Sequence, residues 1–343
     1  MLIDLRSDTL TKPTDEMLQA MLSAKVGDDV FDEDPSVNML QEKTAKLFGK
    51  EAGLFCPSGT MTNQIAIKVH ANSGEEIICD NTAHIYNFEG GGIAANTGAS
   101  VRLILGNNGR YTAQDVLANI NDKNNVHFPL SKLVVIEDTS NKGGGSYWDM
   151  DELLKIRNVC DQHDLKLHLD GARVFNALTE TKNNFIAYGN IFDSISICLS
   201  KGLGAPVGSV LIGGDEFIRK AKRTRKFMGG GMRQAGYLAA AGIYALDHHI
   251  ERLKKDHIKA KIIEETLANS NYIEKVFPVY TNIILAKLSE EINSNQYLNL
   301  LEKNNIRAVG MGHQLVRFVT HLDFSETMLK DFTETIKNLK SNN

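Results

Sequence analysis

The stretch SISICLSKGLGAPVG, from Ser194 to Gly208, places a lysine in an unusual setting. Ser196 to Leu199 is almost entirely apolar and is typical of a buried strand, and Lys201 follows it in a turn rich in glycine. A lysine that is desolvated or close to other cations loses its proton more readily, and the neutral amine is a nucleophile toward carbonyl groups. Lys201 is therefore a candidate for covalent chemistry with a carbonyl compound, although most loop lysines are ordinary solvated charges.

A second predicted strand ends on an acid. In LKLHLDGARVFNA, from Leu165 to Ala177, leucines alternate with polar residues up to Asp170, and Gly171 allows a tight turn before a predicted helix. Thirty-one residues separate Asp170 from Lys201, an interval that fits one helical crossover between parallel strands. Both side chains then lie at carboxyl ends of strands in one open sheet, where such sheets bind ligands. For Asp170 alone, helix capping is the alternative.

This pair suits pyridoxal 5'-phosphate as a cofactor. The lysine forms a Schiff base with its aldehyde, and the aspartate keeps the ring nitrogen protonated so that the ring can accept electrons. Ser58, Gly59 and Thr60 precede a predicted helix, where free backbone N–H groups and the helix dipole attract an anion. Beside a pyridoxal lysine we expect this helix start to hold the phosphate, whereas on its own it would also fit simple capping.

Three further candidates lie at or near predicted strands. His84 follows a strand that ends at Asp80, where it could lie flat on a cofactor ring or simply occupy a turn. Glu137 to Ser140 ends another strand, on the ligand side of the sheet. Arg317 lies within a strand and points opposite to its apolar neighbours, as an exposed strand arginine also would.

The composition disfavours several classes of protein. Of 343 residues, 42% are hydrophobic and the formal net charge is −4, which allows one large core and a smaller one. No basic run has interleaved aromatic residues, so a nucleic-acid partner is not expected, and KAKRTRK from Lys220 to Lys226 is expected to be a solvated helix face. No G-x-G-x-x-G opens a helix after a strand, which disfavours an NAD-binding protein.

No metal site and no membrane segment are expected. The four cysteines lack metal-binding spacing, and Cys79 and Cys198, which lie in strand-like runs, are predicted to be buried thiols in a reducing cytosol. The acidic loop GDDVFDEDP, from Gly27 to Pro35, does not match a calcium loop and is expected to be solvated, although cation binding there stays open. The first residues lack the apolar centre of a signal peptide and no apolar run could span a membrane, so we predict a cytoplasmic protein.

The hydrophobic periodicity predicts an α/β protein with a mostly parallel central sheet flanked by helices and a smaller α/β C-terminal domain. The predicted division is an N-terminal segment 1–15, a large cofactor-binding domain 16–250 and a small domain 251–343. Within it, Asp151 is expected to cap a helix that ends at His163, and the helical period after Gln234 is expected to continue to about Ser270.

Six motifs together resemble threonine aldolase, a family of L-specific, fold-type I pyridoxal enzymes related to the β-eliminating lyases. The resemblance runs in order from residue 3 to about 250, with a weaker likeness around Arg317. The motifs are RSDTLTKPT (Arg6 to Thr14), GDDVFDEDPSVNMLQ (Gly27 to Gln41), PSGTMTNQ (Pro57 to Gln64), HLDGARVFNA (His168 to Ala177), SICLSKGLGAPVGSVLIG (Ser196 to Gly213) and MGGGMRQAG (Met228 to Gly236).

The resemblance implies roles for individual residues. The expected catalytic residues are Lys201, Asp170, His84 and His127, with His127 near the substrate hydroxyl. The expected cofactor-binding residues are Ser58, Gly59, Thr60, His84, Asp170, Arg173, Ser200, Lys201 and Arg233. The substrate carboxylate is expected to bind Ser7, Arg173 and Arg317. Lys226 and Arg233 lie in segments that would line an active site, often that of a neighbouring subunit. The sequence departs from the family at Asp138 and Ser140, where asparagine and histidine are usual.

The resemblance also implies an activity. The enzyme would be a carbon–carbon lyase that splits L-threonine, L-allo-threonine and other L-3-hydroxy amino acids into glycine and an aldehyde, as a homotetramer with shared active sites. Another fold-type I enzyme remains the alternative: a β-eliminating lyase, an aminotransferase or a hydroxymethyltransferase. A pyridoxal-binding protein without catalysis is a third possibility. The sequence leaves open the preferred diastereomer, the preferred aldehyde and whether the general base is His84, His127 or a water.

Overall fold

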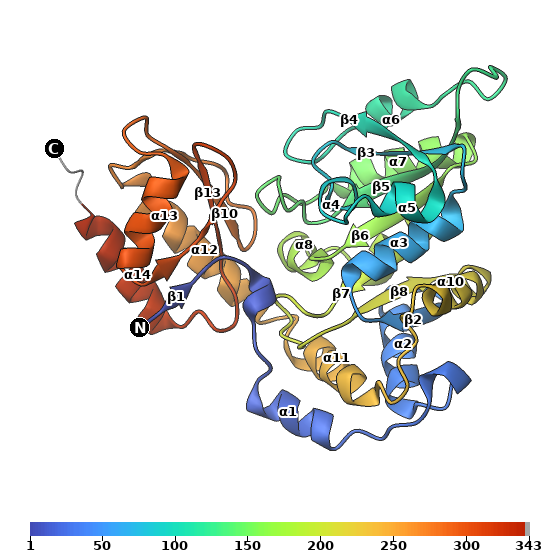
Figure 1. Ribbon diagram of the computed structural model, residues 1–343, viewed down its shortest axis with the longest axis horizontal. Helices are drawn as coiled ribbons and strands as arrows, with labels where there is room; N and C mark the ends of the chain where they lie inside the picture. Colours follow the sequence, from blue (N-terminus) through green and yellow to red (C-terminus); the bar gives the residue numbers. More distant parts are fainter. Residues whose placement is uncertain (340–343) are drawn as a thin grey trace.

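The computed structural model describes residues 1–339, so the polar tail from Lys340 to Asn343 lies outside it. Figure 1 shows two groups of elements: a large sheet covered by helices, and a smaller lobe built from the orange and red C-terminal elements. The strands are β1 (Ile3–Asp4), β2 (Ala52–Cys56), β3 (Glu75–Asp80), β4 (Ser100–Ile104), β5 (Leu130–Glu137), β6 (Lys166–Gly171), β7 (Ser194–Cys198), β8 (Ser209–Gly213), β9 (Ile273–Val276), β10 (Ile283–Leu288), β11 (Ile306–Arg307), β12 (Val309–Gly310) and β13 (Leu315–Val319).

The helices connect these strands and cover both faces of the large sheet. They are η1 (Asp8–Leu10), α1 (Asp15–Leu22), η2 (Asp29–Phe31), α2 (Pro35–Leu47), α3 (Gly59–His70), α4 (His84–Asn87), α5 (Gly92–Thr97), α6 (Ala113–Asn119), α7 (Met150–Gln162), α8 (Val174–Thr181), α9 (Phe185–Gly189), α10 (Asp215–Phe227), α11 (Gly236–His248), α12 (Leu253–Ala268), α13 (Ser294–Lys303) and α14 (Glu326–Asn338).

The large sheet has the strand order β2-β8-β7-β6-β5-β3-β4. All its strands run parallel except β8, which pairs antiparallel with β7 and with β2. The structure therefore confirms the predicted α/β fold with a mostly parallel central sheet. Strands β6 and β7 are direct neighbours, with Asp170 opposite Ser196, so the crossover expected between Asp170 and Lys201 is present.

The two faces of β6 differ in chemistry. Leu167 and Leu169 point into the main apolar core, which α2, α7, α8 and α11 help to form. The alternating residues His168 and Asp170 face the opposite way, toward α3, and both contact Asn63 of that helix. The predicted alternation is thus present, but α3 covers the polar face, so its side chains are buried and must find partners inside the protein.

The smaller lobe has its own apolar core around the antiparallel sheet β12-β13-β10-β9. The N-terminus belongs to this lobe in space, because β1 pairs with β11 and both Ile3 and Leu5 lie in its core. Figure 1 shows β1, in blue, beside α14. The division of the chain at residues 15 and 250 stays a prediction.

Two expectations about helices were wrong. Asp149, not Asp151, caps α7: its Oδ1 accepts hydrogen bonds from the N–H groups of Asp151 and Glu152. The helix expected to reach Ser270 is interrupted between α11 and α12, where His249 Nδ1 lies 2.7 Å from the carbonyl oxygen of Leu203. That contact comes from a distant segment, and the interruption carries no glycine or proline, so the sequence pattern gave no sign of it.

The basic run on α10 is not entirely solvated, which corrects a third expectation. The Arg225 side chain is only 4% exposed and its Nη2 lies 2.8 Å from the carboxylate of Asp29, which is 2% exposed. Its Nη1 donates a hydrogen bond to the Phe55 carbonyl oxygen. The acidic loop therefore supplies a buried counter-charge, and α10 is fixed to it by this pair.

The structure confirms the prediction that Cys79 and Cys198 are buried thiols. All four, Cys56, Cys79, Cys160 and Cys198, are free and buried.

Over residues 1–339, no helix combines the length and the apolarity that crossing a membrane requires.

Removal of the buried cation should destabilise the fold strongly. We expect Arg225→Met to lower the free energy of unfolding by about 3–5 kcal/mol, because Asp29 would stay buried without its counter-charge. Lys222→Met is the matched control on the same helix, since Lys222 pairs with the exposed Asp32, and it should cost less than about 1 kcal/mol. Urea unfolding followed by circular dichroism measures both, and equal losses would contradict the buried pair as a stabilising contact.

Candidate active site

Asp170 and Lys201 line the same cavity, which has a volume of about 190 Å³. Asp170 ends β6 and Lys201 lies in the turn after β7, so the parallel pairing of these strands brings the acid and the amine to one edge of the sheet. Ser200, predicted to contact the cofactor, lines the cavity too. The geometry that the sequence predicted for the central pair is therefore present.

The N-terminus of α3 opens into this cavity, and Ser58, Gly59 and Thr60 all line it. Ser58 caps the helix by accepting a hydrogen bond from the Met61 N–H, so both expected functions of this residue fit the geometry. A Cβ atom at Gly59 would lie 3.5 Å from Ser209 Oγ, a buried oxygen without a well-formed hydrogen bond to residues 1–339. A helix N-terminus beside an unsatisfied hydroxyl suits the phosphate of pyridoxal phosphate.

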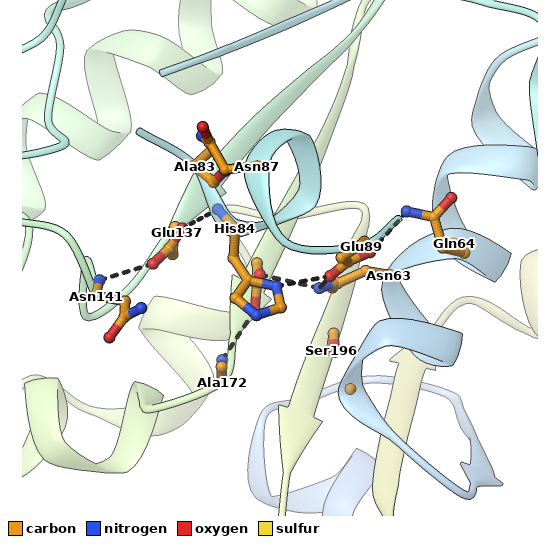
Figure 2. A network of polar contacts seen from close by, with 12 residues as sticks. Asn63, Gln64, Ala83, His84, Asn87, Glu89, Glu137, Asn141, Ala172 and Ser196 are labelled. Carbon is orange, nitrogen blue, oxygen red and sulfur yellow. Dashed lines mark hydrogen bonds and ion pairs between the residues drawn. The ribbon is translucent and has the colours of Figure 1, made fainter. Parts of the chain in front are cut away.

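His84 lines the cavity from the start of α4 and is held by two carboxylates. Its Nδ1 lies 3.0 Å from Glu89 Oε1, and its backbone N–H donates to Glu137 Oε2 at 2.7 Å. Burial lowers the pKa of His84, but the contact with Glu89 and the charges of Asp170, Glu89 and Glu137 outweigh it and raise the pKa above its ordinary value. Figure 2 shows Glu89 between His84 on one side and Asn63 and Gln64 on the other.

Two residues of this network were not assigned a role from the sequence. Asn63 is 2% exposed, and its Nδ2 donates to Glu89 Oε1 and to Asp170 Oδ2, both at 2.9 Å. Glu89 also accepts a hydrogen bond from Gln64 Nε2 at 2.6 Å. The one available signal was the position of Asn63 four residues after Gly59, which puts both on one face of the helix. His84, Glu89 and Asp170 offer ligand atoms within 4.8 Å of one another, a donor set that could also hold a cation.

Two adjacent acids lie behind His84 at the end of β5. Glu137 is buried, and burial together with the charge of Asp170 raises its pKa to about 7, although two backbone N–H groups donate to it. Burial also raises the pKa of Asp138 to about 7, against the hydrogen bond that the Tyr188 hydroxyl donates to its carboxylate. The predicted ligand-side segment therefore contains two carboxyl groups that titrate near neutral pH.

Arg173 is already paired. Its Nε and Nη2 donate to the two carboxylate oxygens of Asp8 at 2.8 and 2.7 Å, and both residues are buried. The charge of Arg173 and its hydrogen bonds keep Asp8 ionised by lowering its pKa, although burial opposes this. Nothing in the sequence indicated that Asp8 pairs with Arg173. Ser7 caps the short helix η1 by accepting from the Thr9 N–H.

Arg317 comes from β13 of the smaller lobe and is not a surface arginine. Its Nη1 donates to Asn141 Oδ1 at 2.8 Å and its Nη2 to the Arg6 carbonyl oxygen at 3.1 Å. Within residues 1–339 its buried Nε has no hydrogen-bond partner. Burial and the nearby charge of Arg173 lower the pKa of Arg317 to about 10. An unpaired buried donor on a cation is the arrangement expected of an anion site.

Six residues expected at the site do not line the cavity: Ser7, Arg173 and Arg317, described above, and His127, Arg233 and Lys226. His127 is exposed in the turn before β5, whereas Glu137 at the other end of that strand contacts His84. Because β5 has 8 residues, its ends are roughly 25 Å apart at about 3.3 Å per residue. Arg233 is exposed and pairs with Asp28, and Lys226 is exposed near the end of α10. In the single chain, His127 therefore cannot reach a substrate bound at Lys201.

Several carboxylates of the acidic loop bind other groups of the protein, so the loop is not solvated throughout as expected. Asp34 is fully buried and accepts hydrogen bonds from four backbone N–H groups, among them those of Gly27 and Gly236. Asp28 pairs with Arg233, and Asp29 with Arg225 as described above. These carboxylates close a loop and fix α10.

The fold and the cavity define a pyridoxal enzyme of fold-type I, and comparison with known proteins agrees. The sequence model of the family described as beta-eliminating lyase matches residues 4–291, so the chain belongs to that family. This assignment confirms pyridoxal 5'-phosphate as the cofactor predicted from Lys201 and Asp170.

The similar proteins carry consistent names. The chain is 40% identical to the low specificity L-threonine aldolase of Escherichia coli K12, over 96% of this chain and 97% of that protein. It is 39% identical to low-specificity L-threonine aldolase 1 of Arabidopsis thaliana, over 93% and 91%. Among solved structures, the threonine aldolase of Leishmania major superposes with a TM-score of 0.84 over 98% of both chains at 21% identity, and a histidinol-phosphate aminotransferase of Clostridium acetobutylicum with 0.73 over 98% of both at 18%. These last two show the shared fold.

The raised pKa of Asp138 predicts a pH dependence of stability. Its folded-state pKa of about 7 exceeds the value of 3.8 for an unperturbed aspartate, so the folded state binds the proton more tightly. The stabilising contribution is complete below about pH 4 and is lost as the pH rises to about 7, a change of a few kcal/mol. We expect the free energy of unfolding of Asp138→Asn to decrease less between pH 5 and 8 than that of the parent protein.

The matched control is Asp164→Asn, since the Asp164 side chain is 94% exposed. It should leave the pH dependence as it is in the parent protein. Urea unfolding across this pH range measures both variants, and an unchanged slope in Asp138→Asn would mean that Asp138 is ionised in the folded state throughout.

Proposed function

We propose that this protein cleaves L-threonine and L-allo-threonine, with other L-3-hydroxy amino acids, into glycine and an aldehyde such as acetaldehyde. The observation that carries the proposal is the single cavity in which Lys201, Asp170, His84 and the N-terminus of α3 meet. Relatives named low-specificity L-threonine aldolases, 39–40% identical over at least 93% of the chain, support it.

The cofactor supplies an aldehyde that condenses with amines and a ring that accepts the electron pair of a broken bond at Cα. In this proposal Lys201 would hold that aldehyde and Asp170 would pair with the ring nitrogen. The first turn of α3, with Ser58, Gly59 and Thr60, binds the phosphate through free backbone N–H groups.

The substrate carboxylate is proposed to bind at Arg317. Its Nε is buried and unpaired within residues 1–339, and Arg173 lies close enough to lower its pKa. Arg173, whose Nε and Nη2 both donate to the Asp8 carboxylate, adds a second positive charge. Ser7, the other residue expected to bind the substrate carboxylate, directly precedes Asp8 in the chain. Arg317 and Arg173 would fix the substrate carboxylate in this way and so orient one bond at Cα for cleavage.

His84 is proposed to take the proton from the substrate hydroxyl, directly or through a water. Glu89 holds Nδ1, which leaves Nε2 as the ring atom available to the substrate. The surrounding carboxylates raise the pKa of His84 and make it a stronger proton acceptor. His127 could act only on a site in another subunit.

We further propose a cytoplasmic homotetramer with shared active sites. Large apolar side chains are exposed near both segments expected to reach a neighbour: Phe31 (69%) and Phe227 (79%) near Arg233, and Val126 (94%) and Phe128 (49%) beside His127. Such side chains are typical of a surface that another chain covers. We also propose residues 16–250 as the cofactor domain and 251–343 as the small domain.

The activity is tested with L-threonine, L-allo-threonine and L-phenylserine as separate substrates. Acetaldehyde should form from the first two without added keto acid or folate, which separates an aldolase from an aminotransferase or a hydroxymethyltransferase. Lys201→Ala should lose the visible absorbance of the lysine-bound cofactor and all turnover, whereas Lys220→Ala, at an exposed helix position, should change neither. Absorbance without any turnover would point to a binding protein.

Arg317→Ala should raise the KM for L-threonine by roughly 10- to 100-fold, because a hydrogen bond to a charged group contributes about 1.5–3 kcal/mol. The cofactor absorbance should stay unchanged, since Arg317 contacts the substrate. Arg307→Ala is the control in the same lobe, where Arg307 forms an exposed pair with Glu302. An unchanged KM in Arg317→Ala would remove this residue from the substrate site.

A further inference from the structure

A buried chain of hydrogen bonds runs beneath α3 and ends at Asp170. His70 Nε2 lies 2.8 Å from Ser194 Oγ, which lies 2.8 Å from His168 Nδ1. His168 Nε2 lies 3.3 Å from Asn63 Oδ1, and Asn63 Nδ2 lies 2.9 Å from Asp170 Oδ2. The proposed mechanism gives no role to the first four of these residues, yet Ser194, His168 and Asn63 are at most 2% exposed.

The two carboxylates at one end of this chain fix the orientation of Asn63. Its Nδ2 lies 2.9 Å from both Asp170 Oδ2 and Glu89 Oε1. An ionised carboxylate can only accept hydrogen bonds, so both amide hydrogens point to these oxygens and Oδ1 faces His168. Oδ1 can only accept, which places a hydrogen on His168 Nε2.

The remaining hydrogens then have one arrangement each. Burial and the neighbouring His70 lower the pKa of His168 to about 3, so its ring is neutral and carries its single hydrogen on Nε2. His168 Nδ1 must therefore accept from the Ser194 hydroxyl, whose oxygen accepts in turn from Nε2 of His70. Burial lowers the pKa of His70 to about 4, so this histidine is neutral too.

We propose that Asn63, oriented by His168, Ser194 and His70, is the positioning residue that holds the Asp170 carboxylate toward the cofactor ring nitrogen and Glu89 against His84. Asn63 Nδ2 and the Ala172 N–H each donate to Asp170, and these two donors fix the orientation of its carboxylate. A reversed Asn63 amide would set its oxygen against two carboxylates and its hydrogens against a donating His168. The inference rests on the proposed pairing of Asp170 with the ring nitrogen.

The test compares two substitutions at His168. His168→Gln keeps an N–H donor near the position of Nε2, whereas His168→Leu fills the space without a donor. The holoenzyme is reconstituted with pyridoxal phosphate isotopically labelled at its ring nitrogen, and nuclear magnetic resonance reports whether that nitrogen is protonated. If His168 only fills the core, leucine should be tolerated at least as well as glutamine.

We expect His168→Gln to keep the protonated ring nitrogen, and His168→Leu to lose part of it. Asn63→Ala should lose more, with kcat for L-threonine reduced about 10-fold or more and KM nearly unchanged. Asn121→Ala is the matched control, since Asn121 Nδ2 donates to the buried Glu76 at the opposite edge of the sheet. It should leave the resonance signal and kcat as in the parent enzyme.

Two results would overturn the inference. One is a ring-nitrogen signal in Asn63→Ala and His168→Leu that matches the Asn121→Ala control, and the other is equal damage from glutamine and leucine at position 168. A neutral ring nitrogen in the unaltered enzyme would instead remove the proposed role of Asp170, on which the inference rests. The resonance signal needs bound cofactor but does not depend on turnover. A failure of this inference can therefore be told apart from a wrong substrate assignment. If Asn63→Ala does not fold, the two variants at position 168 decide alone.

Discussion

The parallel pairing of β6 with β7 is the constraint on which the site depends. The pairing places the end of β6 beside the turn that follows β7. Asp170 and Lys201 therefore line one cavity, although a helical crossover separates them in the chain. Strand β8 returns antiparallel to β7 and begins at Ser209, which pairs with Cys198 at the end of β7. The Ser209 hydroxyl therefore lies at the same edge of the sheet. A slip of one residue in this pairing would turn Asp170 toward the opposite face.

One helix serves both ends of the proposed cofactor site. The N-terminus of α3 offers backbone donors for a phosphate, and Asn63, one turn later, contacts the acid assigned to the ring nitrogen. Helix α3 can pack on the polar face of the strands only because the polar side chains between the helix and the strands form hydrogen bonds with one another. Thr62 Oγ1 and Ser196 Oγ, 2.6 Å apart, are one such pair. The polar layer beneath α3 therefore combines a structural requirement with the chemistry of the site.

The substrate end of the site depends on three segments far apart in the chain. Asp8 of the N-terminal segment accepts hydrogen bonds from Arg173, which precedes α8 in the large lobe, and from Asn282 of the smaller lobe. Arg317 reaches the same region from β13. Arg173 and Arg317 carry two positive charges in this region and Asp8 carries one negative charge, and the resulting excess of positive charge is what a substrate carboxylate would neutralise.

The sequence by itself determined the fold class, the placement of Lys201 beside Asp170 and, from this pair and the resemblance to a family, the cofactor. It also predicted the helix start that is proposed to bind the phosphate. These features depend on local pattern: strand alternation, glycine turns and helix-start residues lie within short windows. The sequence did not show that Arg225 is buried, that Asp8 binds Arg173, that Asn63 joins two carboxylates or that His127 lies away from the cavity. Each depends on which distant segment covers a given side chain, and that is decided only when strands pair and helices pack, because burial and hydrogen-bond partners are properties of the folded chain.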